Sequence, residues 1–228
     1  MASRRDFIKI CVAGTAGLNL AGVSNGMSAR SYSRIIGSNE RLTIAIAGLG
    51  RRLEAYFQPV SLKESNVELV CLCDVMKSQR ESAAQKFSKL ITNVPRLEND
   101  IRKVINDKNI DLLINATPDH WHAPGTWMAV MAGKHVYVEK PCSQNPREGE
   151  LLVELQKKYG KVIQMGNQQR SAYESIDIIR QIHNGVIGTP YEAVAFYTGD
   201  RKSLPVPKKA PVPEGLDWDL FQGPAPRR

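Results

Sequence analysis

A lysine between a glutamate and a proline is the residue of this sequence that is best suited to acid–base chemistry. Glu139-Lys140-Pro141 closes an apolar run over residues 135–139, and such a run predicts a strand. A lysine at a strand end can hydrogen-bond a substrate hydroxyl or the carbonyl of its oxidised product, and it stabilises charge on that oxygen. It can also exchange protons. Lys140 is therefore the candidate catalytic residue, although most lysines are solvated surface groups.

A glycine-containing turn supplies the first candidate for ligand binding. Gly48-Leu49-Gly50-Arg51-Arg52 follows the apolar run 42–47. Two glycines at this spacing allow a tight turn and close approach of the backbone to a pyrophosphate, and the amides of the next helix would favour that anion. Leu53 replaces the third glycine of the dinucleotide-binding fingerprint, and the charge of Arg51 and Arg52 could offset this departure. The alternative is an ordinary strand–helix turn.

An acidic residue after the apolar run 67–73 supports the dinucleotide interpretation. Asp74 comes 24 residues after Gly50, where a carboxylate would accept hydrogen bonds from the adenosine ribose. Because a carboxylate repels a 2′-phosphate, we expect NAD as the cofactor, with NADP less favoured. The alternative role for Asp74 is the N-cap of the following helix.

A polar stretch after the run 111–116 adds a third group of candidates. Residues 115–122 read Asn-Ala-Thr-Pro-Asp-His-Trp-His at the carboxyl end of a predicted parallel strand, where open α/β sheets bind ligands. His120 and His122 do not share a helix face and no third ligand is evident, so no metal site is predicted. The alternative is a capped helix start around a packed Trp121.

These motifs need elements that bring them to one sheet edge. From Leu42 onward, β-forming runs alternate with helical segments, and this pattern predicts an α/β fold with a parallel sheet between helices. The expected strands are 42–47, 67–73, 111–116, 135–139, 162–165 and 191–197, with a short segment near Val94. The expected helices are 53–65, 79–90, 101–106, 125–132, 147–159 and 173–183, and the stretch beyond Gly199 is expected to be a loop.

The first residues indicate export. Arg4-Arg5 precede a weakly apolar stretch (10–22) and a small-residue region (24–29), which is the layout of a twin-arginine signal. The apolar stretch is too short for a stable membrane span. We therefore expect a signal peptide over 1–29, a linker over 30–40, recognition by the twin-arginine export machinery and a periplasmic location. The alternative is a floppy basic N-terminus.

The composition is that of an ordinary globular protein. The chain has 228 residues, 42% of them hydrophobic, and a net charge of +8. No basic motif with interleaved aromatic residues accompanies this charge, so nucleic acid is not an expected partner. The four cysteines have no disulfide-framework or zinc-site spacing.

Together these residues resemble the glucose–fructose oxidoreductase/inositol dehydrogenase (Gfo/Idh/MocA) family of nicotinamide-dependent oxidoreductases. The resemblance runs from about Leu42 to the end of the chain, and it rests on the order and spacing of the glycine turn, Asp74, 116–122, Glu139-Lys140-Pro141 and Gly166-Asn167-Gln168-Gln169-Arg170. It implies a Rossmann-type doubly wound NAD(P) domain over 41–165. Residues 166–228 would begin an α/β substrate domain with an antiparallel sheet.

The resemblance also implies what the site does. Substrates would be sugars, glycosides or polyols, Lys140 would orient the reacting hydroxyl, and the full-length form would be a homo-oligomer. Thr117, His122, Glu139 and Asn167 match positions that line the nicotinamide half of the site. The complete set of expected cofactor-binding residues is Gly48, Leu49, Gly50, Arg51, Arg52, Asp74, Thr117, Pro118, Asp119, Trp121, His122, Glu139, Lys140 and Asn167.

Two alternatives to a dehydrogenase stay open. The family's proton-transfer histidine lies deep in the second domain, and His183 does not match it, so we expect this chain to be a fragment. Some relatives use NAD for transient oxidation during glycoside cleavage, but the intact Glu139-Lys140-Pro141 favours a dehydrogenase. The other alternative is a non-catalytic dinucleotide-binding remnant or sensor.

Overall fold

The computed structural model describes residues 41–196, 199, 203, 208 and 210–227. The expected signal peptide and linker, together with Tyr197, lie outside the described residues. Within the described ranges, no helix has the length and apolar character that crossing a bilayer requires.

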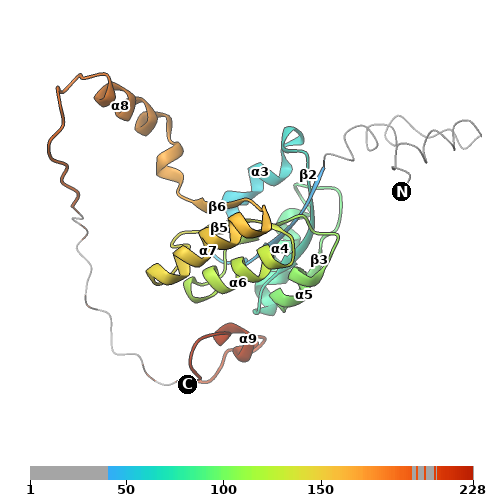
Figure 1. Ribbon diagram of the computed structural model, residues 1–228. Helices are drawn as coiled ribbons and strands as arrows, with labels where there is room; N and C mark the ends of the chain where they lie inside the picture. Colours follow the sequence, from blue (N-terminus) through green and yellow to red (C-terminus); the bar gives the residue numbers. More distant parts are fainter. Residues whose placement is uncertain (1–40, 197–198, 200–202, 204–207, 209, 228) are drawn as a thin grey trace, which may run out of the picture. The chain divides into compact units, whose positions relative to one another are not determined.

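Six parallel strands form one sheet in the order β3-β2-β1-β4-β5-β6. Chain order therefore runs outward in both directions from β1 and β4, which are neighbours at the centre. Figure 1 shows β5 and β6 next to each other on one side of this centre. This is the strand order of dinucleotide-binding Rossmann folds, and ligands bind outside the carboxyl ends of the strands where the order reverses. The strands are β1 (Leu42–Ala47), β2 (Val67–Cys73), β3 (Arg96–Glu98), β4 (Leu112–Asn115), β5 (His135–Glu139) and β6 (Ile163–Gly166).

Both faces of the sheet are buried. Along β1, Ala45 and Ala47 belong to one apolar cluster, whereas Ile44 and Ile46 belong to another on the opposite face. The predicted doubly wound parallel sheet is therefore confirmed. The helices are η2 (Leu53–Tyr56), α3 (Phe57–Ser61), η3 (Lys63–Ser65), α4 (Lys77–Phe87), α5 (Ile101–Asn106), α6 (Asp119–Met131), α7 (Pro146–Tyr159), η4 (Gln168–Ser171), α8 (Tyr173–His183) and α9 (Trp218–Gln222).

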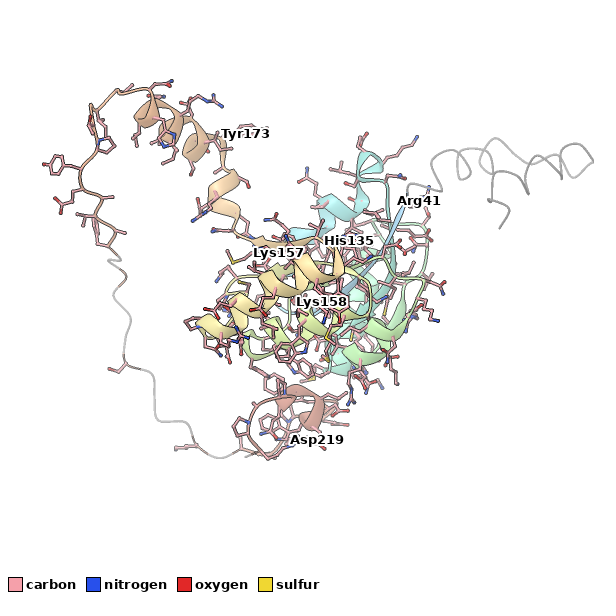
Figure 2. All side chains as sticks on the ribbon, viewed as in Figure 1. Arg41, His135, Lys157, Lys158, Tyr173 and Asp219 are labelled. Carbon is pink, nitrogen blue, oxygen red and sulfur yellow. The ribbon has the colours of Figure 1, made fainter. Side chains whose placement is uncertain are left out.

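Helix α7 shows how local sequence sets the boundaries of an element. Asn145 Oδ1 accepts a hydrogen bond from Glu148 N at 3.0 Å, and the helix ends at Gly160, whose φ is 61°. Lys157 and Lys158 lie in its last turn (Figure 2), where cations complement the helix dipole.

The segment after the glycine turn differs from the single helix expected over 53–65. It is divided into η2, α3 and η3, with a left-handed residue at Asn66. The side chain of Leu53 is 2% exposed and belongs to the apolar cluster that contains Ile44. The first turn after the glycines is thus a short 3-10 helix anchored by a buried leucine, and a long helix dipole aimed at an anion is absent from this described segment.

Helix α6 begins earlier than the sequence pattern indicated. A start at Gly125 was expected, but the helix runs from Asp119 and includes Pro124, which removes one helical hydrogen bond. Asn115 Nδ2 donates to the carbonyls of Trp121 and His122 at 3.3 and 3.0 Å. This buried amide supports the first turns of α6, so the polar stretch 119–122 is helical.

Two further expectations beyond α8 were wrong. Residues 191–196 form no strand, and Tyr191 and Phe196 are 95% and 82% exposed; among the described residues no strand pairs with this segment, and an unpaired strand is not stable. Conversely, Trp218–Gln222 forms α9 where a loop was expected, because Asp217 Oδ1 accepts a hydrogen bond from Leu220 N at 3.0 Å and caps the helix.

Candidate active site

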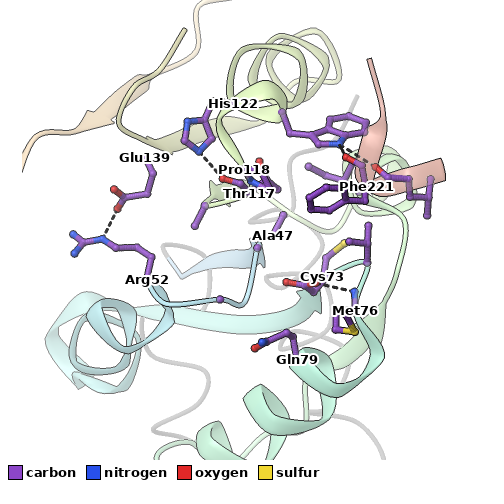
Figure 3. A pocket seen from close by; sticks show the side chains of 18 of the residues that line it. Ala47, Arg52, Cys73, Met76, Gln79, Thr117, Pro118, His122, Glu139 and Phe221 are labelled. Atoms are coloured by element: carbon purple, nitrogen blue, oxygen red, sulfur yellow. Dashed lines mark hydrogen bonds and ion pairs between the residues drawn. The ribbon is translucent and has the colours of Figure 1, made fainter. Parts of the chain in front are cut away.

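A cleft of about 790 Å³ lies at the carboxyl ends of the central strands, and its size suits a small-molecule ligand. Most of the predicted site residues line it (Figure 3). The exceptions are Leu49 and Asn167. The cleft is also lined by residues that were not predicted, namely Ala47, Cys73, Val75, Met76, Gln79, Asn99, Ile101, Ala116, Leu216, Leu220 and Phe221.

The two glycines of the turn after β1 have different surroundings. Gly48 has a φ of 89°, and a Cβ atom there would overlap the backbone of Ala116, which follows β4. A Cβ atom on Gly50 would meet no protein atom within 4 Å. Packing of the chain therefore requires glycine at position 48 but not at position 50, where the backbone is open to the cleft.

Asp74 braces this turn from the end of β2. Its Oδ2 accepts a hydrogen bond from Leu49 N at 2.7 Å, and its Oδ1 accepts one from Met76 N at 2.8 Å. The N-cap of α4 is Met76, so Asp74 does not have the alternative role of N-cap residue. Each carboxylate oxygen keeps a further lone pair, which leaves capacity to accept a ribose hydroxyl.

Leu49 contributes to the turn without lining the cleft. Its side chain is 1% exposed within the core, and its amide donates to Asp74. Asn167 also lies outside the cleft lining, and its backbone N–H donates a hydrogen bond to Met165 O at 3.0 Å. The structure thus brings the other predicted residues together around the cleft but leaves these two beside it.

An ion pair crosses from the glycine turn to the end of β5. Glu139 Oε1 accepts hydrogen bonds from Arg52 Nε and Tyr56 Oη, both at 2.8 Å, and from Gln168 Nε2 at 3.4 Å. Arg52 was expected to offer its charge to a pyrophosphate, but its Nε is committed to Glu139. Both arginines line the cleft, and Arg51 is an exposed residue.

The electrostatics of this group follow from its hydrogen bonds. Burial raises the pKa of Glu139, but the hydrogen bonds from Arg52 and Tyr56 outweigh that effect and leave the pKa below its usual value. Burial and the hydrogen bond to Glu139 raise the pKa of Tyr56 far above its usual value. Glu139 is therefore a carboxylate at neutral pH, and Tyr56 is a neutral donor to it.

His122 connects the two strand ends that carry the candidate chemistry. Its Nε2 lies 2.7 Å from Thr117 O and its Nδ1 lies 2.6 Å from Pro141 O, and the residue is 2% exposed. The hydroxyl of Thr117 in turn donates to Asn115 Oδ1 at 2.6 Å. With both ring nitrogens against backbone carbonyls, His122 positions the residue that follows Lys140. The amine of Lys140 belongs to an exposed residue on the cleft.

Trp121 has a structural partner that the sequence did not reveal. Its Nε1 donates to Leu220 O at 3.0 Å and to Phe221 O at 3.2 Å.

Some of the unpredicted lining residues could have been found from the sequence. Val75 and Met76 come shortly after the end of β2, and ligands lie at the carboxyl ends of parallel strands. No pattern near Leu220 signals a contact with residues about a hundred positions earlier.

The groups around the cleft suit a dinucleotide. Asp74 after β2 is a carboxylate, and the turn after β1 supplies Gly50, which is open to the cleft, and the exposed Arg51. These are the groups expected around a ribose and a pyrophosphate. The described residues contain no cluster of three or more histidine, cysteine, aspartate or glutamate side chains that could hold a metal ion.

Comparison with known proteins agrees with this geometry. A family model described as an oxidoreductase family with an NAD-binding Rossmann fold matches residues 42–167. A glycosyl hydrolase family 109 protein of Saccharopolyspora erythraea is 29% identical over 89% of this chain and 47% of its own length. The D-glucoside 3-dehydrogenase of Escherichia coli K12 is 27% identical over 68% of this chain and 42% of its own length. The chain thus spans about half the length of these curated relatives.

Solved structures show the same fold. The scyllo-inositol dehydrogenase of Lactobacillus casei, solved with bound NAD(H) and scyllo-inositol, superposes with a TM-score of 0.58 at 21% identity, over 65% of this chain and 42% of its own. The family match covers more than half of the 228 residues and includes the ends of all six strands. The chain therefore belongs to the oxidoreductase family with an NAD-binding Rossmann fold.

Proposed function

We propose that this protein is an NAD-dependent oxidoreductase that acts on a CH–OH group of a sugar, glycoside or polyol, with Lys140 as its catalytic residue. The observation that carries the proposal is that Asp74, Gly50 and Lys140 line one cleft. Asp74 follows β2, Gly50 lies in the turn after β1, where a Cβ atom would meet no protein atom, and Lys140 follows β5. These groups suit a ribose, a pyrophosphate and a reacting hydroxyl, in that order.

Several features support NAD as the cofactor. NAD, when bound, supplies a nicotinamide that accepts a hydride from the substrate carbon. Asp74 would accept a ribose hydroxyl and would repel a 2′-phosphate, so NAD is favoured over NADP. Gly50 would let the pyrophosphate approach the backbone, and Arg51 would compensate part of its charge. Thr117, Pro118, Asp119, Trp121, His122 and Glu139 would line the remainder of the cofactor site.

Lys140 would act on the substrate oxygen. Its exposed amine can hydrogen-bond the hydroxyl and stabilise charge on the oxygen as the hydride leaves for the nicotinamide, while the hydroxyl proton would pass to water, directly or through the amine. The backbone that carries Lys140 is fixed on both sides, by the Glu139–Arg52 ion pair and by the contact of His122 with Pro141 O. Such fixed placement is what catalysis by positioning requires.

The choice of substrate class is supported by relatives. One relative is a D-glucoside 3-dehydrogenase and one structural neighbour is a scyllo-inositol dehydrogenase, and both names describe oxidation of a polyhydroxylated ring. We therefore propose sugars, glycosides and polyols as the compounds to test first.

A second candidate function is glycoside cleavage through transient oxidation. A relative named as a glycosyl hydrolase matches 89% of the chain, more than the 68% matched by the glucoside dehydrogenase. In that reaction the hydride returns to the sugar, so that no reduced cofactor accumulates. Release of p-nitrophenol from nitrophenyl glycosides without a rise in NADH would identify it. A non-catalytic sensor would show neither signal while still binding NAD.

We also propose that the protein is exported by the twin-arginine route to the periplasm and that its full-length form is a homo-oligomer. Arg4 and Arg5 support the first proposal. A reporter fused behind residues 1–40 should lose export when both arginines are changed to lysine. Light scattering of the full-length form should give a multiple of its chain mass.

The experiment that tests the proposed function is a turnover assay of the full-length form with NAD and a panel of polyols, sugars and glycosides, followed as NADH absorbance. Lys140→Ala should lower kcat by roughly 100-fold or more. Lys157→Ala, which removes an exposed lysine from α7, should leave kcat within about twofold, as expected for a surface position. Turnover that survives in Lys140→Ala would rule out a catalytic role for this residue.

A further inference from the structure

A segment far along the chain closes one side of the cleft. Residues 215–223, here called the strap, begin beside the loop that follows β2. The backbone of Leu216 pairs with that of Met76 in an antiparallel bridge. Asp217 N donates to Val75 O at 3.1 Å. The first half of the strap is therefore attached to the residues that follow Asp74.

The second half of the strap is attached to α6. Trp121 Nε1 donates to the carbonyls of Leu220 and Phe221, and His120 Nε2 lies 2.7 Å from Phe221 O. Gly223 lies against the Trp121 ring so closely that a Cβ atom would overlap it. The strap thus bridges two strand ends on either side of the glycine turn, those of β2 and β4.

The side chains that the strap presents to the cleft are apolar. Leu216, Leu220 and Phe221 line it together with Met76. In Figure 3, Phe221 and Met76 lie toward one side of the cleft, and Arg52 and Glu139 lie toward the other. The side with Arg52 and Glu139 also holds Lys140, which directly follows Glu139, so it suits the substrate and the nicotinamide. The apolar side is next to Asp74, whose Oδ1 accepts from Met76 N.

From this placement we infer that the strap forms a wall of the adenine subsite and makes recognition of the adenine base depend on Phe221 and its neighbours. The inference rests on the proposed function, because it assigns one part of NAD to one part of the same cleft. The base is bonded to the ribose that Asp74 would hold, so it must lie close to Val75 and Met76. A planar base gains by contact with aromatic and aliphatic faces.

The test compares strap variants with a matched control. Gly223→Ala places a methyl group against Trp121 at a φ of 51°, which should detach the strap. Phe221→Ala removes the ring, together with its contacts to His120 and Trp218, but keeps the backbone carbonyl that Trp121 and His120 contact. Gly160→Ala is the control for a methyl group at a positive φ. Its φ of 61° and ψ of 33° lie in the left-handed helical region, which strains alanine less than the φ of 51° and ψ of −118° at Gly223, and its Cβ would meet no atom within 4 Å. Calorimetric titrations with NAD, ADP-ribose and nicotinamide mononucleotide measure binding of the whole dinucleotide, of its adenosine half and of its nicotinamide half.

We expect both strap variants to raise the dissociation constants of NAD and ADP-ribose by about tenfold, as the loss of one stacking contact does. The dissociation constant of nicotinamide mononucleotide should stay unchanged. Gly160→Ala should bind all three as the wild type does. If Phe221→Ala and Gly223→Ala bind ADP-ribose as tightly as the wild type, or weaken nicotinamide mononucleotide equally, the inference is wrong although the proposed function stands. A wild-type protein that binds neither NAD nor ADP-ribose would overturn the proposed function itself, and the inference with it.

Discussion

Arg52 Nε donates a hydrogen bond to Glu139 Oε1 at 2.8 Å, so that an ion pair joins the turn after β1 to the end of β5. The two residues are 87 positions apart, and Lys140 directly follows the second of them. The contact therefore ties the backbone of the turn after β1 to the residue that precedes the candidate catalytic lysine. The side chain of Glu139 is 8% exposed and that of Arg52 is 41% exposed.

The first prediction concerns the strength of this ion pair. In a double-mutant cycle with Arg52→Met and Glu139→Gln, the coupling in the free energy of unfolding should be about 1 kcal/mol, because solvent screens the half-exposed arginine. Chemical denaturation of the four proteins at neutral pH measures it. Additive effects of the two substitutions would show that the contact does not stabilise the fold.

A second prediction concerns pH. Because the pKa of folded Glu139 lies below its usual value, its contribution to stability is present above its unfolded pKa of about 4.3 and is lost as the pH falls through the folded value. The wild type should therefore lose more stability than Glu139→Gln between pH 6 and the acid end of that window. Urea unfolding across this range tests it, and equal losses in both proteins would contradict the assigned pKa shift.

The third prediction uses one substitution at two glycines. Gly48→Ala should destabilise the protein by about 3 kcal/mol or more, because the methyl group overlaps the Ala116 backbone and φ is positive. Gly50→Ala should change stability by less than about 1 kcal/mol but should weaken NAD binding at least roughly tenfold, since the methyl group occupies the expected approach of the pyrophosphate. Thermal unfolding and NAD titration separate the two effects. Undiminished NAD affinity in Gly50→Ala would place the pyrophosphate elsewhere.

The fourth prediction concerns the choice of cofactor. Asp74→Asn retains an oxygen that can accept from Leu49 N but removes the negative charge. The ratio of NADP to NAD dissociation constants should fall by about tenfold, because the charge that repels the 2′-phosphate is gone. Parallel titrations with both dinucleotides measure the ratio. If the ratio does not change, Asp74 does not select between them.

The sheet and most of the cleft could be predicted from the sequence because both depend on local patterns. Apolar runs located five of the six strands of this sheet, whereas β3 (Arg96–Glu98) lies just after the segment expected near Val94. The parallel arrangement implied that residues 48–52, 74, 117–122 and 139–140 meet at one edge. The chemistry of the individual side chains was harder to predict. Two contacts of the predicted cofactor-binding residues were not foreseen: Arg52 pairs with Glu139, and the backbone N–H of Leu49 donates to Asp74.

Other features depend on contacts that no local pattern encodes. A helix was expected to begin at Gly125, yet α6 begins at Asp119, where Asn115 supports its first turns from the end of β4. The strap shows no amphipathic period, and its short helix α9 is set by the Asp217 cap and by the carbonyl contacts of Trp121. The alternation at 191–196 indicated a strand, but a strand needs a partner as well as an alternating pattern.

Calorimetric titration with NAD of the wild-type protein, freed of bound nucleotide, tests most directly whether the dinucleotide binds in this cleft. We predict one NAD bound per chain, with a dissociation constant on the order of micromolar, and binding that Gly50→Val abolishes without unfolding the protein. Absence of saturable NAD binding by a folded wild-type protein, or unchanged binding by Gly50→Val, would contradict NAD binding at Gly50.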